Sequence, residues 1–281
     1  MSTVQSGTLY VCPTPIGNLG DITLRTLEVL REVDLIAAED TRHSRKLLEH
    51  YGITTPLTSY HEHNEKGKAI DLLNRLKKGE IIALISDAGM PGISDPGTIL
   101  IQKCQEEGIS IDVLPGPNAG ITALILSGMP NEHFLFHGFL SSRSATRKKE
   151  LSKYSLLPFT QIFYEAPHRL VDTLIDISEV FGEREAAVIR EITKIHQTVH
   201  KGTISELIEE FRQNSPRGEI CLVIAPCVET LPTGGPEEWK KEVEILINDG
   251  IKPNDAMKKV GKKYGVGKRE VYQALLADKE S

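Results

Sequence analysis

The chain has 281 residues, of which 40% are hydrophobic and 26% are charged, and its formal net charge is −6. This length allows two domains and a small appendage, and the composition is that of an ordinary globular protein. The acidic balance excludes a protein that coats nucleic acid with its whole surface, although a local basic patch is enough to bind RNA phosphates.

The four cysteines and the first residues carry no signal for metal binding or secretion. Cys12, Cys104, Cys221 and Cys227 form no C-x-x-C pair, and no histidine cluster lies near them. We therefore predict neither a metal site nor disulfides, and we expect a reducing cytoplasm. A signal peptide is not expected, and no apolar run approaches the ~18 residues of a membrane-spanning helix.

Strand and helix patterns alternate through the first half of the chain. The strand patterns lie at residues 8–12, 34–39, 56–60, 80–86 and 110–114. The helix patterns lie at residues 22–33, 42–52, 65–79 and 96–107, with a further apolar segment at 119–128. Apolar strands that alternate with helices predict an α/β domain with a parallel sheet covered on both faces, which we assign to residues 1–125.

The second half gives strands that follow one another with fewer helices between them. The strand patterns lie at residues 133–140, 159–167, 185–191, 194–202 and 218–226. Helices are expected after residue 141, at 168–181 and at 204–214. Consecutive strands favour antiparallel pairs, so we predict a mixed sheet in a second α+β domain, residues 126–227.

A segment rich in proline and glycine, residues 227–239, is typical of a linker. Three short helical patterns follow it, at 237–250, 252–265 and 267–278. The glycine turn between the last two resembles a helix-turn-helix. We predict a small helical extension over residues 237–281.

Three glycine-rich loops each follow a predicted strand of the first sheet. They are PTPIGNLGD at 13–21, SDAGMPGISDPG at 86–97 and LPGPNAG at 114–120. Because open α/β sheets bind ligands at the carboxyl ends of their strands, the three loops predict one cleft lined by backbone groups. The loops lack the lysine of a nucleoside-triphosphate loop. A ligand with adenine, ribose hydroxyls and an amino acid tail would suit such a cleft, helped by the carboxylates of Asp21 and Asp87.

Five motifs give a specific resemblance: TPIGNLGDITLR, AEDTRHSRKLL, ALISDAGMPGISDPG, PGPNA and YEAPHR. In this order they resemble the family of small-subunit (16S) ribosomal RNA 2′-O-ribose cytidine methyltransferases, within the tetrapyrrole-methylase-like class of S-adenosylmethionine enzymes. The resemblance covers residues 8–226. It implies two α/β domains of the tetrapyrrole-methylase type with S-adenosyl-L-methionine between them, 16S ribosomal RNA in the small ribosomal subunit as substrate, and a homodimer.

The resemblance also implies which residues line the cofactor cleft. These are Leu19, Asp87, Ala88, Gly89, Ile93, Asn118, Ala119, Glu165, Ala166 and Gly218. The first loop differs from the G-x-G-P-G-D of the wider class, which argues against a porphyrin or corrinoid substrate.

Basic side chains near the cleft and in the tail are candidates for contacts with RNA phosphates. The predicted RNA-binding residues are Arg42, Arg45, Lys46, Arg147, Arg169, Lys268 and Arg269. A solvated helix face is the alternative explanation for the first three and for the tail.

A ribose 2′-hydroxyl is a weak nucleophile, and a general base within hydrogen-bond reach would raise the rate by ~10²–10⁴. The candidates are His43, Glu165 and Asp40. The residues alone do not decide between them.

Two other functions stay open. The chain could methylate a tetrapyrrole or another small molecule, or it could be a non-catalytic ligand sensor fused to a nucleic-acid-binding tail. The basic tail and the altered first loop count against the small molecule. The last helix offers few side chains suited to reading base edges beyond Lys268, Arg269 and Gln273, which counts against the sensor.

Overall fold

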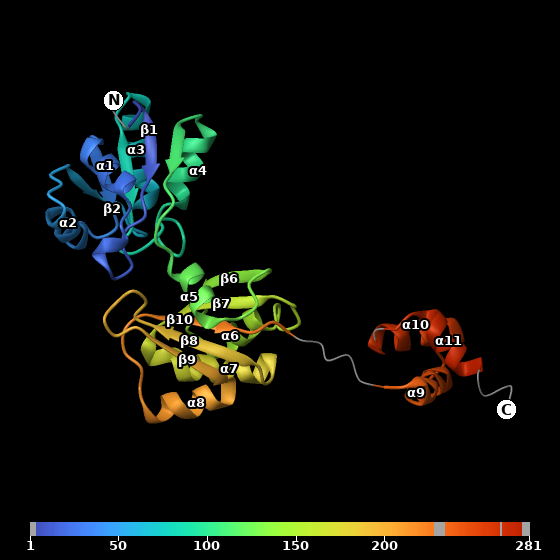
Figure 1. Cartoon of the computed structure of the whole chain (residues 1–281). Helices are drawn as coiled ribbons and strands as arrows, with labels where there is room; N and C mark the ends of the chain where they lie inside the picture. The colour runs from blue at the N-terminus through green and yellow to red at the C-terminus, as the bar shows by residue number, and fades with distance from the viewer. Residues whose placement is uncertain (1–3, 228–233, 265, 277–281) are drawn as a thin grey trace. The chain divides into compact units, whose positions relative to one another are not determined.

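The computed structural model describes residues 4–227, 234–264 and 266–276 (Figure 1). The chain divides into a compact unit at residues 1–227 and a second unit at 228–281. Residues 228–233 of the predicted linker, and the end of the last predicted helix, lie outside the described residues. The boundary between residues 125 and 126 stays a prediction, because both sheets belong to the first compact unit.

The first sheet is parallel, with the strand order β3-β2-β4-β1-β5. Its strands are β1 (Thr8–Val11), β2 (Leu35–Ala38), β3 (Leu57–Ser59), β4 (Ile82–Ile85) and β5 (Ser110–Val113). Its helices are α1 (Leu24–Glu32), α2 (Thr41–His50), α3 (Glu65–Lys77) and α4 (Thr98–Glu106). The prediction of a parallel α/β arrangement is confirmed.

Side chains of β1 show how this sheet is covered. Leu9 and Val11 pack with α3 and α4 on one face, while Tyr10 and Cys12 pack with α1 and α2 on the other. Successive residues of a strand point to opposite faces, so a strand that is covered on both faces has to be apolar throughout. This explains the short, continuous apolar runs of the sequence.

The second sheet is mixed, with the order β6-β7-β10-β8-β9. Its strands are β6 (Phe134–Phe139), β7 (Thr160–Glu165), β8 (Glu185–Arg190), β9 (Thr198–Thr203) and β10 (Ile220–Ile224). Only β6 and β7 pair in parallel, and the other neighbours are antiparallel. The predicted mixed sheet is therefore confirmed.

Helices cover both faces of the second sheet. Helix α5 (Ala119–Ser127) packs on one face through Ala123 and Leu124. The other face is covered by α6 (Ser144–Leu151), α7 (Leu170–Phe181) and α8 (Ile204–Gln213). Since α5 follows directly after the loop that leaves β5, this loop connects one sheet to the other.

The second unit consists of α9 (Pro236–Asn248), α10 (Pro253–Tyr264) and α11 (Lys268–Leu276). Val243, Met257, Val260 and Val271 form its core. The predicted helical extension is confirmed, and Lys268 and Arg269 are exposed at the start of α11. None of the helices in the described ranges is both long enough and apolar enough to cross a membrane.

Candidate functional site

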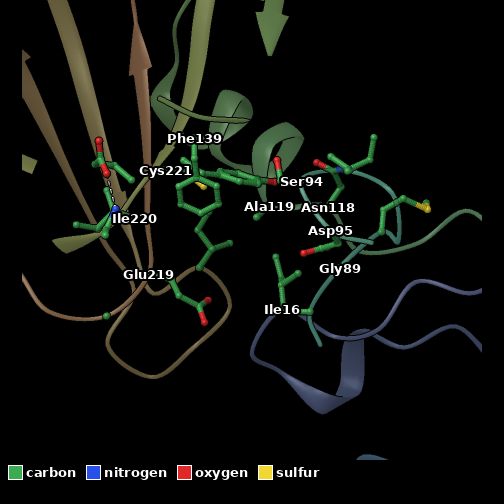
Figure 2. A pocket seen from close by; sticks show the side chains of 18 of the residues that line it. Ile16, Gly89, Ser94, Asp95, Asn118, Ala119, Phe139, Glu219, Ile220 and Cys221 are labelled. Atoms are coloured by element: carbon green, nitrogen blue, oxygen red, sulfur yellow. Dashed lines mark hydrogen bonds between the residues drawn. The ribbon is translucent and has the colours of Figure 1, made fainter. Parts of the chain in front are cut away.

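A cleft of about 420 Å³ lies where the loops of the first sheet meet the strand ends of the second (Figure 2). Its volume is within the ~300–1,000 Å³ that is usual for small-molecule sites. The lining residues are Ile16, Ala88, Gly89, Met90, Ile93, Ser94, Asp95, Asn118, Ala119, Phe139, Tyr164, Glu165, Ala166, Pro167, Ile192, Gly218, Glu219, Ile220 and Cys221.

All three glycine-rich loops reach this cleft, because they leave the neighbouring strands β4, β1 and β5 at the same edge. Thr14 and Gly89 exchange two backbone hydrogen bonds of 2.9 and 3.0 Å, which join the first loop to the second. Gly89 has a φ of 82°, and a Cβ there would lie 3.3 Å from Ile16 Cγ2. The first loop therefore packs against the second loop and supports it, and Ile16 of the first loop faces the cleft.

Asn118 fixes the third loop. Its side-chain oxygen accepts a hydrogen bond from the N–H of Ile121 at 3.0 Å, which caps the N-terminus of α5. The phenol of Tyr164 on β7 accepts a bond from the N–H of Gly120 at 3.1 Å. The start of α5 is therefore held from both sides, with Ala119 at the cleft surface.

The second sheet supplies an apolar wall. Phe139 and Tyr164 lie edge to face, with ring centroids 5.6 Å apart, and Ile220 and Cys221 continue the wall along β10. Burial raises the pKa of Tyr164 and the pKa of Cys221 to about 12 each. Both side chains therefore stay neutral near pH 7.

Eight of the predicted cofactor residues line the cleft. They are Ala88, Gly89, Ile93, Asn118, Ala119, Glu165, Ala166 and Gly218. Two others are not among the lining residues: the carbonyl of Leu19 accepts a bond from the Tyr51 hydroxyl, and the carboxylate of Asp87 accepts one from the N–H of Asp40 at 3.1 Å. Cofactor binding by any of them stays a prediction.

Sequence reasoning did not single out the other residues that line the cleft, some of which lie on the predicted loops and some on the second sheet and the loop after β8. They include Ile16, Met90, Ser94, Asp95, Phe139, Tyr164, Pro167, Ile192, Glu219, Ile220 and Cys221. Asp95 carried a detectable signal, because it is the second Asp of the glycine-rich SDAGMPGISDPG loop. The apolar members look like ordinary core residues in the sequence.

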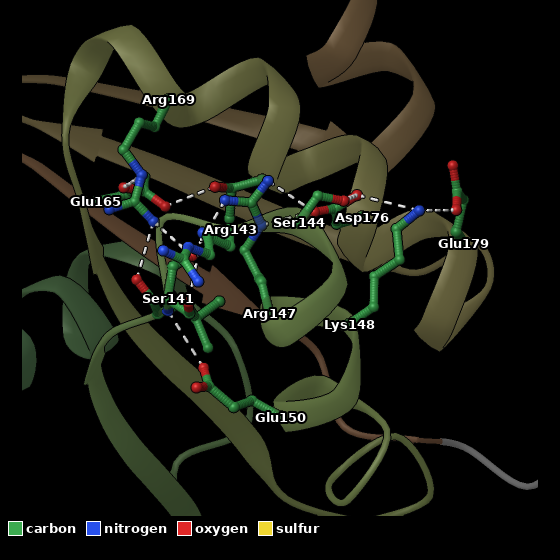
Figure 3. Close-up of polar contacts among 12 residues, drawn as sticks. Ser141, Arg143, Ser144, Arg147, Lys148, Glu150, Glu165, Arg169, Asp176 and Glu179 are labelled. Atoms are coloured by element: carbon green, nitrogen blue, oxygen red, sulfur yellow. Dashed lines mark hydrogen bonds and ion pairs between the residues drawn. The ribbon is translucent and has the colours of Figure 1, made fainter.

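The Glu165 side chain forms several polar contacts within the fold (Figure 3). Its side chain is fully buried, and Oε1 lies 3.2 Å from Arg169 Nε and accepts a 2.8 Å bond from the N–H of Ala166. Oε2 accepts a 2.6 Å bond from the Thr173 hydroxyl. Both oxygens are therefore engaged within the fold, which counts against a role of Glu165 as a general base.

Arg169 completes this arrangement. Its Nη2 donates to the carbonyls of Leu140 and Ser141 at 2.9 and 3.0 Å, just after β6 ends. The pair Glu165–Arg169 thus connects the end of β7 to the end of β6. Because its guanidinium is already bonded within the fold, contact with RNA would use only the exposed 21% of the Arg169 side chain.

Arg147 is placed differently from the prediction. Its side chain is 3% exposed, and its guanidinium lies 2.6 Å from Asp176 Oδ2 on α7. One face of α6 packs on α7, and Arg147 lies on that face (Figure 3). A buried, paired guanidinium does not reach phosphates, so the prediction that Arg147 binds RNA is wrong.

Helix α2 carries the remaining candidates. Arg42, His43, Arg45 and Lys46 are exposed, and none of these residues lines the cleft. Asp40 caps this helix by accepting a 2.8 Å bond from the N–H of Arg42, and this bond lowers the pKa of the Asp40 carboxyl. A lowered pKa makes Asp40 a weaker base, and its proposed catalytic role loses support.

Two carboxyl groups of the second loop, those of Asp87 and Asp95, lie near the carboxyl group of Glu39. Glu39 Oε2 accepts a 3.4 Å bond from the N–H of Asp87, and both of these residues lie close enough to Asp95 to act on its charge. Burial first, and then the charges of Glu39 and Asp87, raise the pKa of Asp95 to about 7. Within the described residues, no group of three or more histidine, cysteine or acidic side chains is arranged to hold a metal ion.

Comparison with known proteins identifies similar chains. Residues 8–208 match the family described as Tetrapyrrole (Corrin/Porphyrin) Methylases. The chain is 46% identical over 272 residues to the ribosomal RNA small subunit methyltransferase I of Synechocystis sp., and this covers 96% of the chain and 98% of that protein. It is 45% identical over 274 residues to the protein of that name from Bacillus subtilis, covering 95% and 94%.

A solved structure supports the fold alone. The crystal structure of the methyltransferase CobJ matches with a TM-score of 0.61 and 19% sequence identity, and it covers 79% of this chain and 95% of that chain. At this identity the likeness concerns the arrangement of the two sheets.

Proposed function

The chain belongs to the family of ribosomal RNA small subunit methyltransferase I proteins, and on that premise we propose that it is an S-adenosylmethionine-dependent 16S ribosomal RNA methyltransferase. We propose further that the methyl acceptor is the ribose 2′-hydroxyl of a cytidine in the small ribosomal subunit. The observation that carries the proposal is the single cleft formed by three glycine-rich loops and the strand ends of a second sheet.

The chemistry of the cleft fits S-adenosylmethionine. Its walls carry small residues at Ala88, Gly89, Ala119, Ala166 and Gly218, which leave the backbone open to a ligand. The charged side chains in its lining are carboxylates and include no lysine or arginine, which suits a ligand with a sulfonium and an ammonium group. When bound there, S-adenosylmethionine would supply an activated methyl group.

This chain's own residues would orient the reactants. The bonds between Thr14 and Gly89, and the cap at Asn118, fix the loops before a ligand arrives. Pre-arranged loops reduce the entropy that is lost when oxygen and methyl group are aligned. The apolar wall of Phe139, Tyr164 and Ile220 would exclude water from the reacting atoms.

The RNA contacts belong to the exposed basic side chains. Arg42, Arg45 and Lys46 follow the end of β2, at the edge of the sheet from which the cleft loops also leave. Lys268 and Arg269 are exposed in the second unit. Phosphates bind such groups with a strong dependence on salt.

We also propose a cytoplasmic homodimer. Ile121 and Ile125 are 46% and 63% exposed on α5, although this helix is almost entirely apolar. A second copy that covers them would remove this apolar surface from water. Light scattering of the purified protein over a range of concentrations tests the dimer.

The experiment uses S-adenosylmethionine with a tritiated methyl group and small ribosomal subunits that lack the methylation. Free 16S RNA and a porphyrinogen serve as parallel acceptors. We expect label in the subunit RNA, at a site that becomes resistant to alkaline cleavage. Label in the porphyrinogen instead, or no transfer to any acceptor, would overturn the proposal. A tetrapyrrole acceptor and a non-catalytic sensor are not favoured, because relatives that match over nearly the whole chain bear a ribosomal RNA methyltransferase name.

A further inference from the structure

We propose that the loop between β8 and β9, residues 191–197, contacts the substrate RNA at the rim of the cleft and places Ile195 against its unpaired bases. This inference rests on the proposed function. Ile192 of the loop lines the cleft, so the loop lies beside the place where the methyl group would be transferred. Three residues further on, the Ile195 side chain is 94% exposed.

The loop has a backbone conformation that its residues do not adopt freely. Among the described residues, the non-glycine residues with a positive φ are Ser94, Glu191 and Thr193, with φ of 64°, 51° and 66°. Ser94 lines the cleft, and the other two flank Ile192, which also lines it. A positive φ is especially unfavourable for a β-branched residue such as Thr193. Such strain persists only where the surroundings impose it, and it collects at ligand-binding segments.

Contacts with the first glycine-rich loop hold the β8–β9 loop in place. The N–H of Asn18 donates to the Thr193 hydroxyl at 3.0 Å. A Cβ on Gly17 would lie 2.5 Å from Lys194 Cγ, so the two loops are closely packed. Within the loop, the N–H of Thr193 donates to Gln197 Oε1 at 2.7 Å. The exposed isoleucine is therefore carried on a fixed support, and binding a partner would not require the loop to become ordered first.

The charges at this end of the second sheet favour RNA as the partner. The carboxylates of Glu191 and Glu219 are both paired with Lys194, at 3.0 and 3.2 Å. The Arg190 guanidinium donates to the carbonyl of Arg217 at 3.2 and 2.9 Å, which brings the two arginines to the same end of the sheet. With the carboxylates paired, these arginines are available to phosphates beside the loop.

An apolar side chain at the rim suits the shape that the RNA has to take. A nucleotide whose ribose reaches into a cleft is displaced from the regular stack, which exposes the faces of the neighbouring bases to water. An apolar side chain that inserts there covers such a face and keeps the strand open. Leu19, which is 39% exposed and follows Asn18 on the first loop, adds a second apolar side chain on the same side.

The test compares the full-length wild-type protein with Ile195→Ala, with the conservative variant Ile195→Leu, and with Ile70→Ala as the matched control. Ile70 is 50% exposed on α3. Binding to small subunits is measured by filter binding over a range of salt concentrations, and affinity for S-adenosylhomocysteine is measured by calorimetry. We expect Ile195→Ala to bind subunits about tenfold more weakly, because a buried apolar contact is lost. Ile195→Leu and Ile70→Ala should bind subunits as wild type does, and all three variants should keep the wild-type affinity for S-adenosylhomocysteine.

The salt dependence separates the apolar contact from the phosphate contacts. Ile195→Ala should leave the slope of log K against log salt unchanged, because no phosphate contact is lost. Arg217→Ala should reduce the slope by roughly 0.7–0.9.

A second measurement identifies the partner without depending on activity. Ile195→Cys and Ile70→Cys are labelled with a benzophenone group and irradiated with small subunits, with labelled wild type as the background for the native cysteines. We expect a crosslink to 16S RNA from position 195 and none from position 70.

The inference is overturned if position 195 crosslinks to a second copy of the chain or to no RNA, or if Ile195→Ala binds subunits as wild type does. These outcomes, in a wild type that methylates subunits, leave the proposed function intact. Failure of the wild type to methylate subunits would instead overturn the proposed function, and this inference with it.

Discussion

Gly218 lies directly against the carboxylate of Glu191, and a Cβ on Gly218 would meet Glu191 Oε1 at 2.3 Å. This carboxylate accepts a 2.8 Å bond from the N–H of Glu219 and pairs with Lys194 at 3.0 Å. The loop after β8 is thus hydrogen-bonded to the start of β10 at the cleft. Only glycine at position 218 leaves room for the Glu191 side chain that makes this contact.

Gly218→Ala should therefore weaken both folding and the cleft. Its φ of 83° adds backbone strain to the clash, so we expect a loss of about 1–3 kcal/mol in the free energy of unfolding. S-adenosylhomocysteine should bind at least tenfold more weakly by calorimetry. The matched control is Gly182→Ala, which has a φ of 73° but no described atom within 4 Å of the added Cβ. Gly182→Ala should lower the free energy of unfolding by about 1 kcal/mol and leave the affinity for S-adenosylhomocysteine unchanged. A wild-type affinity in Gly218→Ala would contradict the prediction.

Asp176→Ala tests the buried ion pair between α6 and α7. The change leaves the Arg147 guanidinium buried with the carbonyl of Ser141 as its remaining partner at 3.3 Å. We expect a loss of about 3–5 kcal/mol in denaturant unfolding, because an unpaired buried charge is costly. The double change Arg147→Met with Asp176→Leu should recover most of it.

Lys148→Ala is the control for this prediction. Lys148 also approaches Asp176, at 3.3 Å, but its side chain is 35% exposed. The loss of stability for Lys148→Ala should be much smaller than that for Asp176→Ala, as for other solvent-accessible pairs. Equal losses for Asp176→Ala and Lys148→Ala would show that burial does not set the energy of this pair.

The sequence predicted the two sheets because their strands are short apolar runs with helices or turns between them. The expected strand at 194–202 was partly wrong, since β9 begins at Thr198 and residues 191–197 form a loop. Ile192 on this loop lines the cleft, and Ile195 is 94% exposed. Ile192 contributes to the cleft surface, and no local periodicity distinguishes that use from a strand.

The candidate site was predictable to the extent that it depends on loops. Glycine and proline mark such loops in any sequence, and the family resemblance then pointed to Ala88, Gly89, Asn118 and Ala119 within them. The wall from Phe139 to Cys221 combines side chains of three strands of the second sheet that lie far apart in the sequence, so it has no local signature in the chain. Arg147 was mistaken for a surface residue because a basic segment does not reveal which of its members faces α7.

Alanine at Arg42, Arg45 and Lys46 should weaken binding to small subunits without changing affinity for S-adenosylhomocysteine. Each phosphate contact that is lost should reduce the slope of log K against log salt by roughly 0.7–0.9, so the triple variant should lose about 2–3. The control is alanine at Lys66 and Lys78, which are exposed beside α3 on the opposite face of the sheet. The slopes are measured by filter binding between 50 and 300 mM salt. Equal slopes in wild type and the triple variant would show that α2 does not contact RNA phosphates.

Asp95→Asn should stabilise the protein at alkaline pH. The carboxyl has a pKa of about 7 in the fold against 3.8 as its ordinary value, so the folded state takes up a proton between these values. Wild-type stability from this group is therefore greatest in acid and is lost as the pH rises towards and through 7. The full shift is reduced by solvent screening because the group is only partly buried, and we expect a gain of about 1–2 kcal/mol for Asp95→Asn at pH 8.

The gain should become small near pH 4, where Asp95 is protonated in the folded wild type and the pH is close to the ordinary value of 3.8 that applies to the unfolded chain. Denaturant unfolding at pH 4, 6 and 8 measures it, with Asp71→Asn as the exposed control that should change little at any pH. A variant that is less stable than wild type at pH 8 would show that the ionised carboxylate is held by favourable contacts.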